Sequence, residues 1–266
     1  LIVPDFLEEL NIEVIKLYCE PNGDFPHNPE PLKKNLTELS KKVIECNADL
    51  GIAVDPDVDR LVFVCEDGEL FGEENTLVAC ADYVLSKTPG STVSNLSSSR
   101  ALNDITKKHN QVHYYSAVGE VNVVDKMKKC KAVIGGEGNG GVIYPKSHYG
   151  RDSIVGIGLF LSLYVERGLI ASKLLETYPK YFMVKEKINL SPSLDVDNIL
   201  GQIAEKYKNE NIDLVDGVRI DFKDSWVQLR KSNTEPIIRI YSEAKSNDKA
   251  SELIKEIEIL IKNIIS

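Results

Sequence analysis

Short apolar segments alternate with longer segments of helical periodicity along most of the chain. Strands are predicted at 51–54, 61–65, 92–95, 112–115 and 132–134, and helices at 32–44, 73–87, 99–109, 123–129 and 152–165. Asp152 can cap the last of these helices. Strands and helices that alternate in this way favour layered α/β units, in which helices cover the faces of a sheet. The fold class expected for this part is therefore α/β, with two consecutive units that each contain a mixed sheet.

The two ends of the chain show different patterns. Residues 6–10 have helical spacing and residues 14–18 form an apolar run that predicts a strand. Helical periodicity also continues over 171–178, after which Pro179 ends it and suggests a boundary near residue 180. The remainder predicts strands at 183–190, 218–222, 226–229 and 237–241 and helices at 198–208 and 248–264. We expect a two-layer α+β domain with its helices on one face of the sheet.

Composition limits the classes of partner. A formal charge of −9 over 266 residues argues against binding to duplex DNA, which usually requires a basic face. The longest apolar stretch, at 154–165, is too short to span a bilayer. The five cysteines are odd in number and include no Cys-x-x-Cys pair, which favours free thiols in a reducing compartment. We expect a cytoplasmic protein that binds neither nucleic acid nor membrane.

Alternate carboxylates follow the strand predicted at 51–54. Asp55, Asp57 and Asp59 lie on one short loop, where they can turn toward a single hard cation such as Mg²⁺. Arg60 beside them offers a guanidinium to phosphate. The loop lacks the glycine and the closing glutamate of an EF-hand, and the alternative to a metal site is a solvated acidic turn.

A glycine-rich segment, residues 135–141, follows the strand predicted at 132–134. It presents Glu137 and Asn139 on what is expected to be a flexible loop, and a carboxylate with an amide suits sugar hydroxyls. The segment has no Gly-Lys-Ser/Thr ending, so it is not a nucleotide P-loop. Glycines that serve only tight turns are the alternative interpretation.

A third polar loop, at 230–236, lies between two predicted strands. Its cations, hydroxyls and amide suit a phosphate, and its candidate ligands are Arg230, Ser232, Asn233 and Thr234. Arg239 is a weaker candidate, because from the sequence it could point to either side of the sheet. A plain polar hairpin is the alternative.

The order and spacing of these three loops resemble the α-D-phosphohexomutase family. That family typically carries a metal loop Asp-Gly-Asp-Gly-Asp-Arg, a sugar loop that starts Gly-Glu, and a phosphate loop Arg-x-Ser-Asn-Thr-x-Pro. The resemblance begins with the stretches at 17–20 and 25–31 and covers essentially the whole chain. It implies an incomplete second domain at 1–75, a third domain at 76–180 and a fourth at 181–266.

The resemblance also implies an activity, the interconversion of hexose 1-phosphate and hexose 6-phosphate through a bisphosphate, with glucose and mannose phosphates as leading substrates. By resemblance, Asp55, Asp57 and Asp59 would hold Mg²⁺, and Glu137 and Asn139 would read the sugar hydroxyls. The loop at 230–234 would hold the non-reacting phosphate, and Arg60 would lie near the transferred one.

Three departures from the family pattern affect these expectations. The family's phosphoserine lies in a Ser-His-Asn-Pro motif, and residues 26–29 of this chain read Pro-His-Asn-Pro instead. We therefore expect the chain alone to be inactive. Pro56 and Val58 replace the usual glycines of the metal loop, and Glu120 replaces a basic residue that often contacts the sugar phosphate.

Several questions stay open at the level of sequence. Arg100 and His148 are candidates for the general acid or base, with a structural hydrogen bond as the alternative for His148. Phosphoglucosamine mutase is the closest rival activity. A noncatalytic sugar-phosphate binding fragment and a metal-dependent phosphatase are two further hypotheses. The sequence predicts no oligomeric state.

Overall fold

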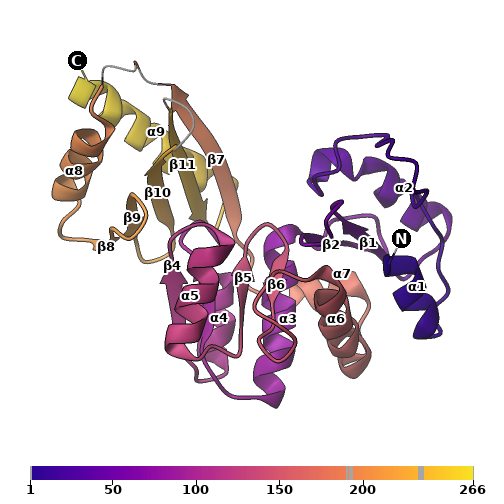
Figure 1. Ribbon diagram of the computed structural model, residues 1–266. Coiled ribbons are helices and arrows are strands. Elements are labelled where there is room, and N and C mark those ends of the chain that lie inside the picture. The colour runs from indigo at the N-terminus through magenta and orange to yellow at the C-terminus, as the bar shows by residue number, and fades with distance from the viewer. Residues whose placement is uncertain (1, 190, 192–193, 233–236, 266) are drawn as a thin grey trace.

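The computed structural model describes residues 2–189, 191, 194–232 and 237–265. Three structural units follow one another along the chain, with the middle unit between the other two (Figure 1). The predicted fold class is confirmed, because a mixed α/β arrangement is followed by an antiparallel sheet with two helices. Within the described ranges, no helix combines the length and the apolar character needed to cross a membrane.

The described part of the first unit contains helices and a short hairpin. Its elements are α1 (Ile2–Glu9), the 3₁₀ turn η1 (Lys33–Asn35), α2 (Thr37–Glu45), β1 (Leu50–Val54) and β2 (Leu61–Cys65). The two strands pair antiparallel and form a two-stranded sheet, so the sheet described in this unit is antiparallel where a mixed one was expected. The prediction of a strand at 14–18 is wrong, because this segment pairs with neither β1 nor β2. Its apolar residue Val14 packs against the core instead. A short apolar run does not by itself reveal whether a partner strand is present.

The middle unit carries a four-stranded mixed sheet. It contains α3 (Glu73–Lys87), β3 (Thr92–Asn95), α4 (Ala101–Lys108), β4 (His113–Ser116), α5 (Glu120–Cys130), β5 (Ile134–Glu137), β6 (Gly141–Ile143), α6 (Ser153–Arg167) and α7 (Ala171–Glu176). The strand order is β4-β3-β5-β6, with β3 parallel to both neighbours and β6 antiparallel to β5. The predicted cap of α6 is confirmed, since Asp152 accepts a hydrogen bond from the Val155 N–H at 3.0 Å.

One apolar core joins the first unit to the middle unit. Phe63 of β2 stacks on Phe160 of α6 with ring centroids 3.8 Å apart, and Phe71 meets Phe160 edge-on at 5.0 Å. All three side chains are fully buried. Burial of large aromatic side chains is a major source of stability, so the two units are stabilised together.

The C-terminal unit is a five-stranded antiparallel sheet. It contains β7 (Phe182–Asn189), α8 (Val196–Lys206), β8 (Asn211–Asp213), β9 (Val218–Asp221), β10 (Trp226–Lys231), β11 (Ile237–Ala244) and α9 (Asn247–Ile265), in the strand order β7-β11-β10-β9-β8. The short edge strand β8 was not predicted. Alternate residues such as Ile220, Val227 and Ile240 form one apolar core with α8 and α9, which confirms the two-layer arrangement.

The opposite face of this sheet packs against the middle unit through polar groups. The buried Arg219 donates to the backbone oxygen of Leu96 and lies 4.2 Å from the ring centre of Trp226. Glu243 accepts from the Trp226 indole at 2.8 Å and from the Arg100 N–H at 3.0 Å. These contacts are charge-assisted and satisfied, which a buried polar interface requires.

The shared aromatic core yields a stability prediction. We expect Phe160→Ala to lower the free energy of unfolding by about 3–5 kcal/mol, because it removes the ring that Phe63 and Phe71 both contact. The matched control, Phe25→Ala, removes a ring that is 59% exposed and should change stability by less than about 0.5 kcal/mol. Urea unfolding curves measure both. Equal losses in the two variants would contradict a core shared through Phe160.

A second stability prediction concerns Glu74, at the start of α3. Its carboxylate accepts from the Ser99 N–H at 2.8 Å and lies 4.0 Å from Lys185 of β7, and burial raises its pKa to about 8. Between the ordinary pKa of 4.5 and the raised pKa of about 8, the Glu74 carboxyl is ionised in the unfolded chain and protonated in the folded chain. Stability should therefore fall as pH rises from 6 to 8, by less than about 1.4 kcal/mol per pH unit.

The test is urea unfolding at pH 6, 7 and 8. Glu74→Gln should remove most of this slope, whereas Glu186→Gln, on an exposed position of β7, should keep it. A slope that Glu74→Gln leaves intact would show that another group titrates.

Candidate functional site

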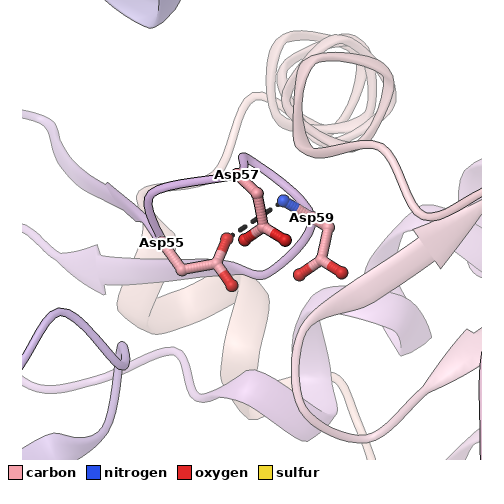
Figure 2. Close-up of side chains that lie close together, drawn as sticks. All are labelled: Asp55, Asp57 and Asp59. Carbon is pink, nitrogen blue, oxygen red and sulfur yellow. Dashed lines mark hydrogen bonds between the residues drawn. The ribbon is translucent and has the colours of Figure 1, made fainter.

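Three aspartates converge on the loop between β1 and β2. Asp55, Asp57 and Asp59 each offer one carboxylate oxygen, and these oxygens lie within 4.8 Å of one another. Figure 2 shows the three side chains turned toward a common space. Asp55 also has a structural role, since its Oδ1 accepts the N–H groups of Asp59 and Arg60, each at 3.0 Å.

The backbone of this loop is strained and is held by the middle unit. Val58 has φ +60°, in the left-handed region that β-branched residues rarely adopt. Its carbonyl accepts from the Ser153 N–H at 3.0 Å, at the start of α6. Three residues further on, the Leu61 N–H donates to the Gly140 carbonyl at 3.2 Å. The start of α6 and the turn between β5 and β6 therefore hold this loop in place.

The aspartate group fits a hard divalent cation. Burial raises the pKa of Asp55, and the neighbouring Asp59 raises it further, so a bound cation would favour the charged form of Asp55. Asp57 is exposed and makes no hydrogen bond or ion pair with the residues that the structure describes. Closely spaced carboxylate oxygens are the ligands that Mg²⁺ prefers, so these three residues can hold a metal ion.

The glycine-rich segment forms a tight hairpin. The prediction of a flexible loop from residue 135 onward is wrong, because β5 extends to Glu137 and pairs with β6. Glu137 is 5% exposed and accepts hydrogen bonds from Asn95 Nδ2 at 2.7 Å and from the Gly119 N–H at 3.0 Å. Asn139 is partly exposed at the turn, and its Oδ1 accepts from the Gly141 N–H at 3.2 Å.

Arg151 joins the aspartate loop to this hairpin. Its guanidinium donates to Oδ2 of Asp59 and, at 2.9 Å, to Oε2 of Glu137. Sequence reasoning missed Arg151 as a site residue, because it lies in a loop whose direction no periodicity predicts. The capping residue Asp152 beside it was the only signal that placed it near the start of α6.

The third loop places cations side by side on one face of the C-terminal sheet. Arg230 of β10 lies directly opposite Arg239 of β11, which in turn lies opposite Lys187 of β7. Residues directly opposite one another share a face, so Arg239 points to the same side as Arg230. Ser232 is buried, and its N–H donates to the Ile237 carbonyl at 3.1 Å. The predicted ligands Asn233 and Thr234 lie outside the described residues.

Asp216 links Arg230 to the middle unit. Its Oδ2 accepts from Nη1 of Arg230 at 3.3 Å and from the Val118 N–H at 2.9 Å. Since Gly119, the next residue, donates to Glu137, a chain of polar contacts connects all three loops. It runs from Asp59 through Arg151, Glu137, Gly119, Val118 and Asp216 to Arg230.

The two acid–base candidates make structural contacts. Nε2 of His148 lies 2.8 Å from Oδ2 of Asp152, whose other oxygen caps α6. Arg100 precedes α4, and its guanidinium lies 5.9 Å from the ring centre of Tyr181. Arg60 of the aspartate loop pairs with Glu30 at 3.0 Å and lies 3.6 Å from Asp55. Catalytic roles for these three residues stay predictions.

Comparison with known proteins gives a consistent result. Models of the phosphoglucomutase/phosphomannomutase family match three consecutive blocks of the chain, namely α/β/α domain II over residues 1–68, α/β/α domain III over 73–181 and the C-terminal domain over 187–260.

Individual relatives agree with these family models. A phosphoglucomutase/phosphomannomutase of Thermococcus kodakarensis is 37% identical over 259 residues, which are 96% of this chain and 56% of that protein. A "probable phosphoglucosamine mutase" of Methanopyrus kandleri is 35% identical over 269 residues, 99% of this chain and 59% of that protein. The chain thus spans little more than half the length of these relatives.

Solved structures show the same fold. A phosphoglucomutase/phosphomannomutase family protein of Burkholderia thailandensis has a TM-score of 0.86 and 25% identity, covering 98% of this chain and 57% of that one. A more distant structure is the N-acetylphosphoglucosamine mutase of Aspergillus fumigatus in complex with GlcNAc-6P and magnesium. It has a TM-score of 0.60 and 14% identity, covering 80% of this chain and 48% of that one. With domains II, III and IV matched in order along its length, the chain belongs to the α-D-phosphohexomutase family.

Proposed function

We propose that this chain forms the metal-binding and substrate-binding part of a phosphohexomutase, an isomerase that interconverts hexose 1-phosphate and hexose 6-phosphate. The observation that carries the proposal is the chain of polar contacts from Asp59 to Arg230, which joins the three loops. A substrate with a sugar ring and a phosphate would meet carboxylate and amide groups at the hairpin of Glu137 and guanidinium groups on the C-terminal sheet.

The phosphate end of this site is supported by a row of like charges. Arg230, Arg239 and Lys187 follow one another across the sheet, and like charges placed directly opposite are destabilising. Asp216 offsets Arg230 at 3.3 Å in this structure. A phosphate, with more acceptor oxygens and more charge than one carboxylate, is a better partner for such a row. We assign the non-reacting phosphate to Arg230 and Ser232, with Asn233 and Thr234 as further ligands.

At the other end, Asp55, Asp57 and Asp59 would hold Mg²⁺. The ion, when bound, would offset negative charge on the transferring phosphoryl group. The protein's own contribution there is Arg60, whose guanidinium already faces Asp55 and Asp59 at 3.6 and 3.9 Å. We assign Arg60 to the phosphate that is transferred, and Glu137 and Asn139 to the sugar hydroxyls.

The substrate sugar is a separate question. We propose glucose and mannose phosphates, with glucosamine phosphate as the alternative, since the relatives carry both kinds of name at similar identity. A phosphoserine donor is part of the proposed reaction, and residues 1–266 contain no Ser-His-Asn-Pro motif. We therefore expect this chain alone to bind substrate without turning it over, in a cytoplasmic setting, with Arg100 or His148 as acid–base candidates.

The phosphate assignment yields a binding prediction. In calorimetric titrations with Mg²⁺ present, we expect the chain to bind at least one of glucose 1-phosphate, mannose 1-phosphate and glucosamine 1-phosphate. Arg230→Ala should weaken that binding by at least about 10-fold, because charge-assisted hydrogen bonds to the phosphate are lost. The matched control, Arg167→Ala, removes an arginine that contacts Asp82 and should leave binding unchanged.

Two outcomes would count against the proposal. If folded protein binds none of the three sugars, the chain does not contain a working substrate site. If Arg230→Ala and Arg167→Ala bind alike, the phosphate lies elsewhere. A coupled assay for hexose 6-phosphate tests the expected lack of turnover, and any turnover by the pure chain would show that the proposed phosphoserine is not required.

A further inference from the structure

Arg151 lies at the meeting point of three carboxylates from separate segments. Its guanidinium donates to Asp59 on the aspartate loop and, at 2.9 Å, to Glu137 on β5. Its Nε lies 3.7 Å from Oε2 of Glu120, at the start of α5. The side chain is 15% exposed, so these charges interact with little screening by solvent.

Glu120 and Gly141 fix the position of Arg151. Oε1 of Glu120 accepts the backbone N–H of Arg151 at 2.9 Å, which holds the main chain as well as the side chain. A Cβ at Gly141 would lie 2.4 Å from Cδ of Arg151, so the glycine leaves the space through which the side chain passes. The guanidinium is therefore placed by its surroundings and not by one flexible contact.

Arg151 constrains one oxygen of Asp59 and one oxygen of Glu137. Arg151 holds Oδ2 of Asp59, while Oδ1 faces Arg60 at 3.9 Å, and one oxygen of Asp59 belongs to the aspartate group that can hold a cation. It also holds Oε2 of Glu137, whose Oε1 is held by Asn95 and Gly119. Groups that orient metal ligands from behind commonly set metal affinity.

We propose that Arg151 is a positioning residue that couples metal binding at Asp55, Asp57 and Asp59 to hexose-phosphate binding at the hairpin of Glu137. This inference rests on the proposed function, because it assigns the metal and the sugar to those groups. The planar fork of arginine suits the task, since it bonds two carboxylates at once in fixed directions. Any movement of Glu137 on substrate binding is thereby passed to Asp59.

Three different roles for Arg151 predict different results. If Arg151 only supplied charge, Arg151→Lys would bind Mg²⁺ as tightly as the unsubstituted chain. An arginine that competes with the metal for Asp59 would, when removed, leave a more negative site and tighter Mg²⁺ binding. A positioning role predicts weaker Mg²⁺ binding in Arg151→Lys although the charge is kept.

The experiment is calorimetric titration of this chain with Mg²⁺, alone and with saturating amounts of the hexose 1-phosphate that it binds best. Arg151→Lys should weaken Mg²⁺ binding by about 10-fold. In the unsubstituted chain, the sugar should tighten Mg²⁺ binding by roughly 5-fold or more, and in Arg151→Lys this factor should fall toward one. Gly141→Ala, which displaces the Arg151 side chain without changing charge, should act in the same direction.

Controls separate positioning from folding. Arg167→Lys is the matched change outside the site and should leave both quantities unchanged, and thermal unfolding checks that each variant is folded. This inference alone would be overturned if folded Arg151→Lys bound Mg²⁺ as tightly as the unsubstituted chain or more tightly. It would also be overturned if the sugar tightened Mg²⁺ binding by the same factor in both proteins. If the unsubstituted chain binds neither Mg²⁺ nor any of the sugars, the proposed function fails together with it.

Discussion

The close approach of the Leu61 backbone to Gly140 is the contact on which the arrangement of the site depends. Gly140 has φ +89°, and a Cβ at this position would lie 2.3 Å from the Leu61 carbonyl oxygen, so only glycine fits. The contact brings the end of the aspartate loop against the turn of the β5–β6 hairpin. Because Phe63, two residues further along β2, stacks on Phe160, the aromatic core stabilises the same approach. The aspartate loop and the hairpin of Glu137 are thus adjacent because two units share one core.

The C-terminal sheet contributes side chains to the site because successive residues of its strands face opposite sides of the sheet. One set of alternate residues is apolar and faces α8 and α9, and the other set includes Arg219, Gln228 and Arg230. The polar set meets the middle unit, where Ser97 donates to Gln228 at 2.7 Å and Asp216 accepts from Val118. A polar interface tolerates rearrangement better than an apolar core, because its groups can exchange partners with water or ligand. The face of the sheet that carries Arg230 is therefore attached to the rest of the candidate site by exchangeable contacts.

Sequence reasoning recovered the parts of this fold that local pattern determines. The strands at 61–65 and 92–95 and the cap at Asp152 match the structure, because apolar runs and capping chemistry are encoded locally. The failures have a common cause in partners distant along the chain. The segment 14–18 pairs with neither strand of the first unit, and β5 extends to Glu137 because it pairs with β6. Arg151 forms its contact with Asp59, which lies 92 positions earlier in the sequence. Periodicity within a segment carries no information about such partners.

Contacts with distant segments also explain the departures from the family pattern. Val58 adopts φ +60° where the family usually has glycine, a conformation that costs on the order of 1–2 kcal/mol for a residue with a Cβ. The contacts of its neighbours hold it there, through Asp55 on one side and Ser153 on the other. Glu120 brings an acidic group where a cation is usual, yet it accepts from Arg151, so a positive charge is supplied from another segment. The acidic residue at 120 and the arginine at 151 are therefore one feature, and replacing Arg151 would remove the guanidinium that Glu120 shares with Asp59 and Glu137.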